Sequence, residues 1–179
     1  MTRELQEKLE SYQRVWAEVD LDAIWENMVH MKENIAEKTK ILAVIKTDGY
    51  GHGGVPIAKM LEQLDFMFGY AAATYEEAHV LREAGVKKPI LILGYTFPYC
   101  YEELIREEIR PAVYRRDTVE ELVAAAAKVG QKAKVHIKVD TGMGRIGITP
   151  DEEGLVRQIP YGTSGAGSGG HLHPFCQIR

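Results

Sequence analysis

Residues 41–72 read ILAVIKTDGYGHGGVPIAKMLEQLDFMFGYAA, and this stretch decides the fold. Its first part, 41–46, is a short and almost wholly apolar run, which is typical of a strand that is buried on both faces. A glycine-rich loop at 49–54 and a helical segment follow, and 66–72 is again a strand. Strand, helix and strand with short connections predict a parallel βαβ unit.

The same alternation continues towards residue 140. Thr74 and Glu77 match a capping box for a helix that ends at Gly85. Asp117 is expected to cap an alanine-rich helix that ends near Gly130. Further strands are predicted at 89–94, 110–114 and 133–140, with a helix around 99–108. Strand and helix therefore alternate five times, which indicates an α/β protein with a parallel sheet.

The segment before this repeat is predicted to hold one strand and one helix. Residues 14–21, RVWAEVDL, alternate apolar and polar side chains as a strand does. Asp22 is expected to N-cap the next helix, whose apolar face carries Ile24, Met28, Met31 and Ile35. Residues 1–13 form a charged N-terminal extension that lacks the apolar core of a signal peptide.

Two architectures fit this pattern. One is an open parallel α/β sheet, and the other is a (β/α)8 barrel of the TIM type. A complete barrel takes ~250 residues, whereas this chain has 179 residues and five predicted core strands. The alternation by itself therefore favours the open sheet.

The last part of the chain, 160–179, has a different composition and reads PYGTSGAGSGGHLHPFCQIR. Five glycines fall within nine residues where a sixth strand should begin, and this composition is typical of a flexible linker. Thr149 and Pro150 announce a helix that is cut short. We expect that the reading frame fails after about Ile159 and that the tail is not the true continuation of the domain. A native glycine-rich tail is the alternative.

Composition excludes several classes of function. The net charge of -4 argues against a nucleic-acid-binding protein, because phosphate binding needs clustered Lys and Arg. Cys100 and Cys176 form neither a CxxC pair nor a metal spacing, so no metal site is expected. No apolar run approaches the ~20 residues that span a bilayer, so no membrane contact is expected. We expect a cytoplasmic protein with two reduced thiols.

Lys46 is the sharpest candidate for chemistry. It ends an apolar strand, and functional groups in parallel α/β proteins gather at the carboxyl ends of strands. Partial desolvation at such a place makes a lysine amine a nucleophile or a base, although many strand-end lysines simply point to solvent. The following loop, 49–54, permits close backbone approach and contains Tyr50 and His52, but it is not a phosphate-binding P-loop.

A second polar cluster lies in 136–147, HIKVDTGMGRIG. His136, Lys138 and Asp140 alternate with apolar residues, so they face the same side of a strand. In a barrel this side is the interior, where a lysine is costly unless it is paired or neutralised. Arg145 follows the strand, where a guanidinium can hold a carboxylate or another oxyanion. The alternative is a solvent-facing polar row on an edge strand, followed by an ordinary loop arginine.

Three segments together resemble the alanine racemase family. VIKTDGYGHG, 44–53, closely resembles the cofactor-lysine signature, HIKVDTGMGRIG resembles the second signature, and WAEVDLDAI, 16–24, resembles the entry segment. The likeness runs from about Arg14 to Ile159. Thr47 and Gly49 stand where the family more often has alanine, but neither departure removes a chemical group that the mechanism needs.

The resemblance implies a fold-type III enzyme with a (β/α)8 barrel, a β-rich domain after it, and a homodimer. It changes the expected architecture from the open sheet to an incomplete barrel, with about five of the eight core strands within 14–159. By the same analogy, the strand at 14–21 would pack with the β-rich domain.

The resemblance also implies the cofactor pyridoxal 5'-phosphate and a role for each matching residue. Lys46 would carry the cofactor covalently and act as one of two bases at the substrate Cα. Tyr50 would help to hold the cofactor phosphate. Arg145 would bind the phenolic oxygen of the cofactor and help to place the substrate carboxylate. Lys138 matches a lysine that is carbamylated in some members and then pairs with that arginine.

The implied activity is the interconversion of L-alanine and D-alanine, which supplies D-alanine for cell-wall peptidoglycan. A serine or broad-specificity racemase, and a non-catalytic barrel that binds pyridoxal phosphate, are the alternatives. The opposing base and the arginine that faces the pyridine nitrogen would lie past residue 159, and nothing in the tail matches them. This chain is therefore expected to be an inactive, truncated form.

Overall fold

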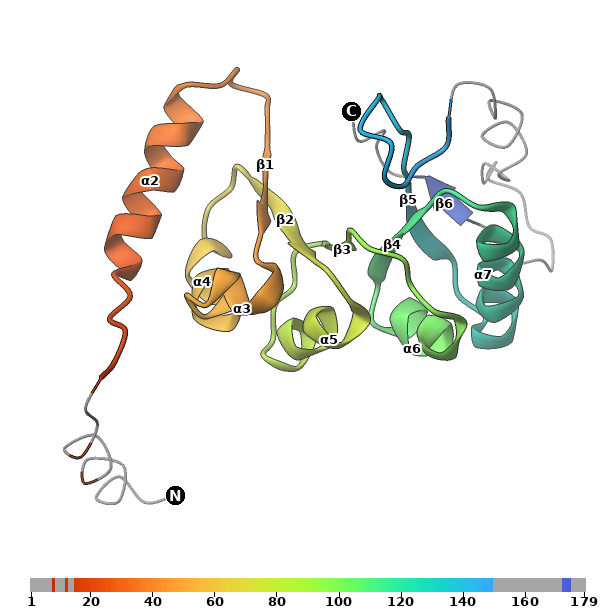
Figure 1. Ribbon diagram of the computed structural model, residues 1–179, viewed down its shortest axis with the longest axis horizontal. Helices are drawn as coiled ribbons and strands as arrows, with labels where there is room; N and C mark the ends of the chain where they lie inside the picture. The colour runs from red at the N-terminus through yellow and green to blue at the C-terminus, as the bar shows by residue number, and fades with distance from the viewer. Residues whose placement is uncertain (1–7, 9–11, 13–14, 150–171, 175–179) are drawn as a thin grey trace.

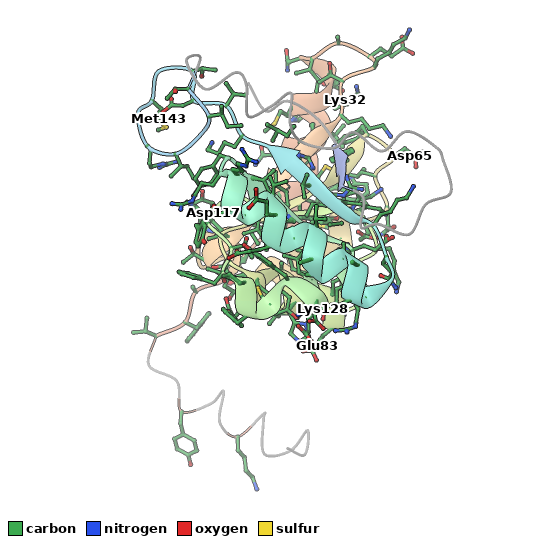
Figure 2. The ribbon with its side chains drawn as sticks, turned by 90° about the vertical axis from the view of Figure 1, so that its right-hand side faces the viewer. Lys32, Asp65, Glu83, Asp117, Lys128 and Met143 are labelled. Atoms are coloured by element: carbon green, nitrogen blue, oxygen red, sulfur yellow. The ribbon has the colours of Figure 1, made fainter. Side chains whose placement is uncertain are left out.

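The computed structural model describes residues 8, 12, 15–149 and 172–174 of the protein. Its centre is a six-stranded, all-parallel sheet with the strand order β1-β2-β3-β4-β5-β6 (Figure 1). The strands are β1 Ile41–Val44, β2 Met67–Ala72, β3 Ile90–Ile92, β4 Ile109–Val113, β5 Ala133–Ile137 and β6 Leu172–Pro174. Loops before and after the strands lie at opposite sides, as Asp65 before β2 and Met143 after β5 show in Figure 2.

Helices connect most of the strands. They are α2 Leu21–Glu33, α3 Lys46–Tyr50, α4 Gly54–Leu61, α5 Tyr75–Glu83, the 3-10 helix η1 Pro98–Cys100, α6 Tyr101–Arg106 and α7 Arg116–Val129. In Figure 1, α3 to α7 line one side of the sheet, whereas α2 stands beside β1 and packs on α4. Across the described ranges, no helix has the length and apolar character that crossing a membrane requires.

This arrangement decides between the two architectures that fitted the sequence. An open doubly wound sheet reverses its strand order and carries helices on both faces. Here each strand pairs with the next one along the chain, and α3 to α7 all lie on one side of the sheet. A sheet of this kind is part of a (β/α)8 barrel. The barrel is not closed, because β1 and β6 are the two edges of the sheet.

The hydrophobic core lies between the sheet and its helices. Alternate strand residues point into this layer and meet the apolar faces of α4 to α7. The largest fully buried members include Leu61, Met67, Tyr70, Ile90, Ile92, Leu104, Ile109 and Leu122. Each such side chain stabilises the fold by about 1.5–3 kcal/mol. The sheet and helices therefore form a packed unit even though the barrel is open.

The helix caps agree with the sequence in one case and differ in two. Thr74 caps α5, because its side chain accepts a hydrogen bond from the Glu77 amide, 3.4 Å away, as the capping box predicted. Asp20, and not Asp22, caps α2 by accepting from the Ala23 amide. The predicted cap Asp117 lies inside the first turn of α7 and accepts from the Thr118 amide, 2.7 Å away. Asp20 and Asp22 both lie at the start of α2, and Asp117 lies one residue inside α7, so a nearby acidic residue does not by itself fix the capping position.

The strand predicted at 14–21 is wrong for residues 15–20, which have no strand conformation. A strand needs a neighbour that accepts and donates its hydrogen bonds. No described strand lies beside this segment, and the side chain of Trp16 is 69% exposed. The alternating pattern that suggested a half-buried strand therefore finds no partner here.

The tail contributes an element that its composition did not predict. Leu172–Pro174 form β6, which pairs in parallel with β5 so that Ala133 lies opposite Leu172. The helix that Thr149 and Pro150 announce falls outside the described residues. That the tail is not the natural continuation of the domain stays a prediction.

Candidate active site

Lys46 lies where the sequence predicted, at the carboxyl end of β1. The Ile45 amide donates to the Ala71 carbonyl, 2.9 Å away, so the end of β1 is fixed against β2. Ile45 is buried, and the chain then turns sharply so that Lys46 begins α3 with a half-buried side chain. The apolar strand thus presents the amine at the sheet end where functional groups gather in this kind of fold.

The turn after Lys46 has a left-handed backbone. Thr47, Asp48, Gly49 and Tyr50 have φ values of 55°, 52°, 63° and 56°. Each non-glycine residue in this region costs roughly 1–2 kcal/mol, and a β-branched one is unusual. Gly49 also leaves room for a close approach, because a Cβ there would lie 3.2 Å from the Gly54 nitrogen, a tight contact that would need a small shift. The sequence predicted a glycine-rich loop at this point but not its handedness.

Two carboxylates stabilise the left-handed turn. Asp48 Oδ1 accepts a hydrogen bond from the Gly54 amide, 2.7 Å away. Glu77 Oε1 accepts from the Thr47 amide at 2.9 Å, and its Oε2 accepts from the Ala73 amide at 2.8 Å. The sequence identified Glu77 only as part of a helix cap. Its bond to the turn joins positions 30 residues apart, which no local pattern reveals.

Tyr50 and His52 complete this loop. The Lys46 Nζ lies 5.7 Å from the centre of the Tyr50 ring, and the Tyr50 side chain is 59% exposed. His52 Nδ1 lies 3.1 Å from the Gly49 carbonyl oxygen and 3.2 Å from that of Tyr50. This places His52 as a residue that orders the loop, while Tyr50 stands beside the amine.

The second predicted cluster follows β5. The Lys138 amide donates to the Val113 carbonyl at 2.9 Å, which continues the pairing with β4, and its side chain is half-buried. Asp140 Oδ1 accepts from the amides of Gly142 and Gly144, and these bonds hold the pKa of this carboxyl below its ordinary value. Arg145 lies in the same loop with an exposed side chain. Figure 2 shows the loop by its Met143 label.

The structure does not bring the two clusters into contact. They follow β1 and β5, which are four neighbour steps apart in the sheet. At the usual strand spacing this is about 19 Å along the sheet. Figure 1 accordingly shows α3 and the loop after β5 well apart. No hydrogen bond, ion pair or ring contact joins Lys46 to Lys138 or Arg145 in the described part of the chain.

Two buried basic residues, Arg110 and His136, lie on the face of the sheet opposite the helices. They alternate with core residues of β4 and β5, respectively. Arg110 is 8% exposed and His136 is 3% exposed. The Arg110 guanidinium carbon lies 5.6 Å from the centre of the Phe68 ring. Burial, and then the positive charge of Arg110, lower the pKa of His136 to about 4. The sequence placed His136 beside Lys138 but gave no sign of Arg110.

This lowered pKa predicts that acid destabilises the fold through His136. Above its unfolded-state pKa of 6.5 the imidazole is neutral in both states, so it contributes no pH dependence. Between pH 6.5 and about 4 only the unfolded state binds the proton, so the free energy of unfolding falls, by on the order of 3 kcal/mol. Urea denaturation across this range should show the loss in the parent chain and a smaller loss in His136→Leu.

The control for this measurement is His30→Gln, which changes an exposed histidine on α2. It should keep the full loss of stability on acidification, because it leaves His136 in place. The carboxyl groups are the same in the parent, His136→Leu and His30→Gln, so they contribute equally to the pH dependence of all three. Equal slopes for the parent and His136→Leu would show that His136 carries a proton in the folded state.

Comparisons with known proteins identify the family of this chain. A family model described as "Alanine racemase, N-terminal domain" matches residues 19–163. The chain belongs to the alanine racemase family. An alanine racemase from Clostridium perfringens (strain ATCC 13124) is 49% identical over 141 residues, which are 79% of this chain and 36% of the relative. Alanine racemase 1 from Oceanobacillus iheyensis is 44% identical over 147 residues, covering 82% of this chain and 39% of the relative.

A solved alanine racemase from Clostridium difficile 630 has the same fold over most of the chain. Its sequence is 35% identical and its TM-score is 0.79. The match covers 90% of this chain and 41% of that structure. The expected fold is therefore confirmed: this open sheet corresponds to part of the barrel of alanine racemases. The chain spans about two fifths of the length of the alanine racemases that it matches.

Proposed function

We propose that this chain carries the cofactor-lysine segment of an alanine racemase, an enzyme that interconverts L-alanine and D-alanine. The single observation that carries the proposal is Lys46, half-buried at the carboxyl end of β1 inside the region that the family model matches. We propose further that the complete enzyme is a cytoplasmic homodimer that supplies D-alanine for peptidoglycan.

The residues around Lys46 fit pyridoxal 5'-phosphate. Lys46 has a primary amine at the start of the left-handed turn. The exposed Tyr50 side chain, next to this amine, can offer its hydroxyl to a phosphate. Arg145 has an exposed guanidinium, which suits an oxyanion such as a phenolate or a carboxylate. When bound, this cofactor supplies an electron sink for negative charge at the substrate Cα. The chain's own part is to hold the cofactor and, through Lys46, to move a proton at that carbon.

We also propose that Lys138 is carbamylated. Its half-buried ammonium would lose one proton, and the neutral amine would then add carbon dioxide and release a second proton. The two steps convert a cation into an anion just after β5, in the segment that leads to Arg145. The resulting carbamate and the guanidinium would form a charge-assisted pair. A high-resolution electron-density map of the complete enzyme tests this, since a bare amine at Lys138 would refute it.

A chimera tests the proposed activity. Residues 15–149 of this chain replace the matching segment of the Clostridium perfringens alanine racemase, which is 49% identical. We expect the purified chimera to form D-alanine from L-alanine, measured with a coupled D-amino-acid oxidase. Faster conversion of L-serine would favour the serine racemase alternative. Tight cofactor binding without conversion of either amino acid would favour the non-catalytic barrel.

Arg145 is predicted to serve catalysis and not stability. In the chimera, Arg145→Ala should lower turnover by about 100-fold or more, as the loss of an anion-stabilising donor does. The melting temperature should stay near that of the parent, because the side chain is exposed. Met143→Ala is the matched control, since Met143 lies in the same loop and is 77% exposed. Normal turnover with a large fall in melting temperature would mean that Arg145 is structural.

A further inference from the structure

We infer that Glu77 is a positioning residue for Lys46, because its carboxylate ties the left-handed turn after β1 to the first turn of α5. The tie is direct: Glu77 Oε1 accepts from the Thr47 amide, which belongs to the peptide that joins Thr47 to Lys46. That Lys46 binds a cofactor rests on the proposed function, whereas the tie itself rests on the structure alone.

The Thr47 amide needs an acceptor from outside its own helix. It lies in the first turn of α3, where backbone N–H groups have no partner within the helix. The residue is also held at a φ of 55°, a conformation that a threonine rarely adopts without support. Glu77 supplies the acceptor at 2.9 Å. The same bond therefore satisfies the amide and opposes relaxation of the turn.

A carboxylate is the side chain that this place requires. Two backbone amides converge on Glu77, one from Thr47 after β1 and one from Ala73 after β2. A glutamate has two acceptor oxygens and satisfies both, whereas a glutamine has one acceptor oxygen and satisfies only one. Glu77 thus links the carboxyl ends of two neighbouring strands at the point where Lys46 leaves the sheet.

The helix that carries Glu77 is itself fixed. Thr74 caps its N-terminus, and Ala78 and Leu81 on the same helix are buried in the core. The carboxylate is therefore held from a rigid element and is not a mobile surface group. Without it, the turn loses this hydrogen bond to α5, and the backbone that carries the Lys46 amine is held less firmly.

The test uses the whole chain and three variants, Glu77→Ala, Glu77→Gln and Thr74→Ala. Amide hydrogen exchange reports the Thr47 bond directly, and the rate of borohydride-trapped labelling of Lys46 by pyridoxal phosphate reports the position of the amine. In Glu77→Ala, Thr47 exchange should rise about tenfold and Lys46 labelling should slow about tenfold. In Glu77→Gln, one of the Thr47 and Ala73 amides should lose protection while the other keeps it.

Thr74→Ala separates the tie from helix stability. It removes the cap of the same helix but leaves both Glu77 bonds in place, so Thr47 exchange and Lys46 labelling should stay within about twofold of the parent. Equal effects of Thr74→Ala and Glu77→Ala would overturn the inference, and so would unchanged Thr47 exchange in Glu77→Ala. If Glu77→Ala unfolds, the isosteric Glu77→Gln decides by the same exchange measurement. Failure of the parent chain to label at Lys46 would count against the proposed function only, since the exchange data judge the tie.

Discussion

Replacing Lys46 with arginine will abolish covalent labelling of residue 46 by pyridoxal phosphate and borohydride. Arginine keeps the positive charge but its guanidinium stays protonated, so it does not act as an amine nucleophile. Lys46 is half-buried next to the exposed Tyr50, and it begins a turn that two carboxylates fix in place. If the surrounding loop holds the cofactor phosphate, as proposed, Lys46 would react in preference to other lysines.

Peptide mapping of the reduced protein is the measurement. The parent chain should carry the label on the peptide that contains Lys46, and Lys46→Arg should reduce that label to background. Lys59→Arg is the matched control, since Lys59 is an exposed lysine on the neighbouring helix α4 and its replacement should leave the labelling unchanged. A parent chain that is labelled only at other lysines would remove Lys46 from the proposed mechanism.

Much of the fold could be predicted because its signals are local. Apolar runs such as ILAVIK and PILILG mark strands wherever they occur, and the structure has strands at 41–44 and 90–92. Thr74 and Glu77 stand three positions apart, so a local sequence pattern predicts that the helix begins directly after Thr74. The carboxyl end of an apolar strand can likewise be predicted from the sequence, and Lys46 does lie shortly after β1. Its role in catalysis stays a prediction.

The features that the sequence did not reveal depend on contacts between distant residues. The segment 15–20 has an alternating pattern but no strand beside it, and a short glycine-rich tail pairs with β5. The bond from Glu77 to Thr47 and the closeness of Arg110 to His136 exist only once β1 and β2, or β4 and β5, lie side by side. The strand–helix alternation and the chain length also favoured the open sheet. The barrel was expected only from the family resemblance, and the strand order bears it out.

The proposed site offers a candidate base, Lys46, on one face of the substrate only. A preparation of these 179 residues will not racemise alanine at a rate comparable with the chimera. Racemisation needs one group to take the proton from one face of Cα and another to return it on the opposite face. The Tyr50 ring lies beside the Lys46 amine but comes from the same turn, and in the described part of the chain no side chain forms a hydrogen bond or ion pair with that amine. The inner face of the open sheet has no opposing wall from the described strands.

The open sheet adds a second obstacle. Its edges, β1 and β6, have no further strand partner among the described residues, and exposed edges of this kind can pair with other chains. The core between sheet and helices is intact, so the chain can still fold locally and Lys46 can still react slowly with free cofactor. A yellow protein is therefore no evidence of turnover.

The assay incubates the purified chain with pyridoxal phosphate and L-alanine and measures the D-alanine formed with a coupled oxidase. The chimera that contains the same residues 15–149 is assayed in parallel. Turnover within about tenfold of the chimera, a difference of only ~1.4 kcal/mol in the barrier, would mean that the segment needs neither a second base nor a closed barrel.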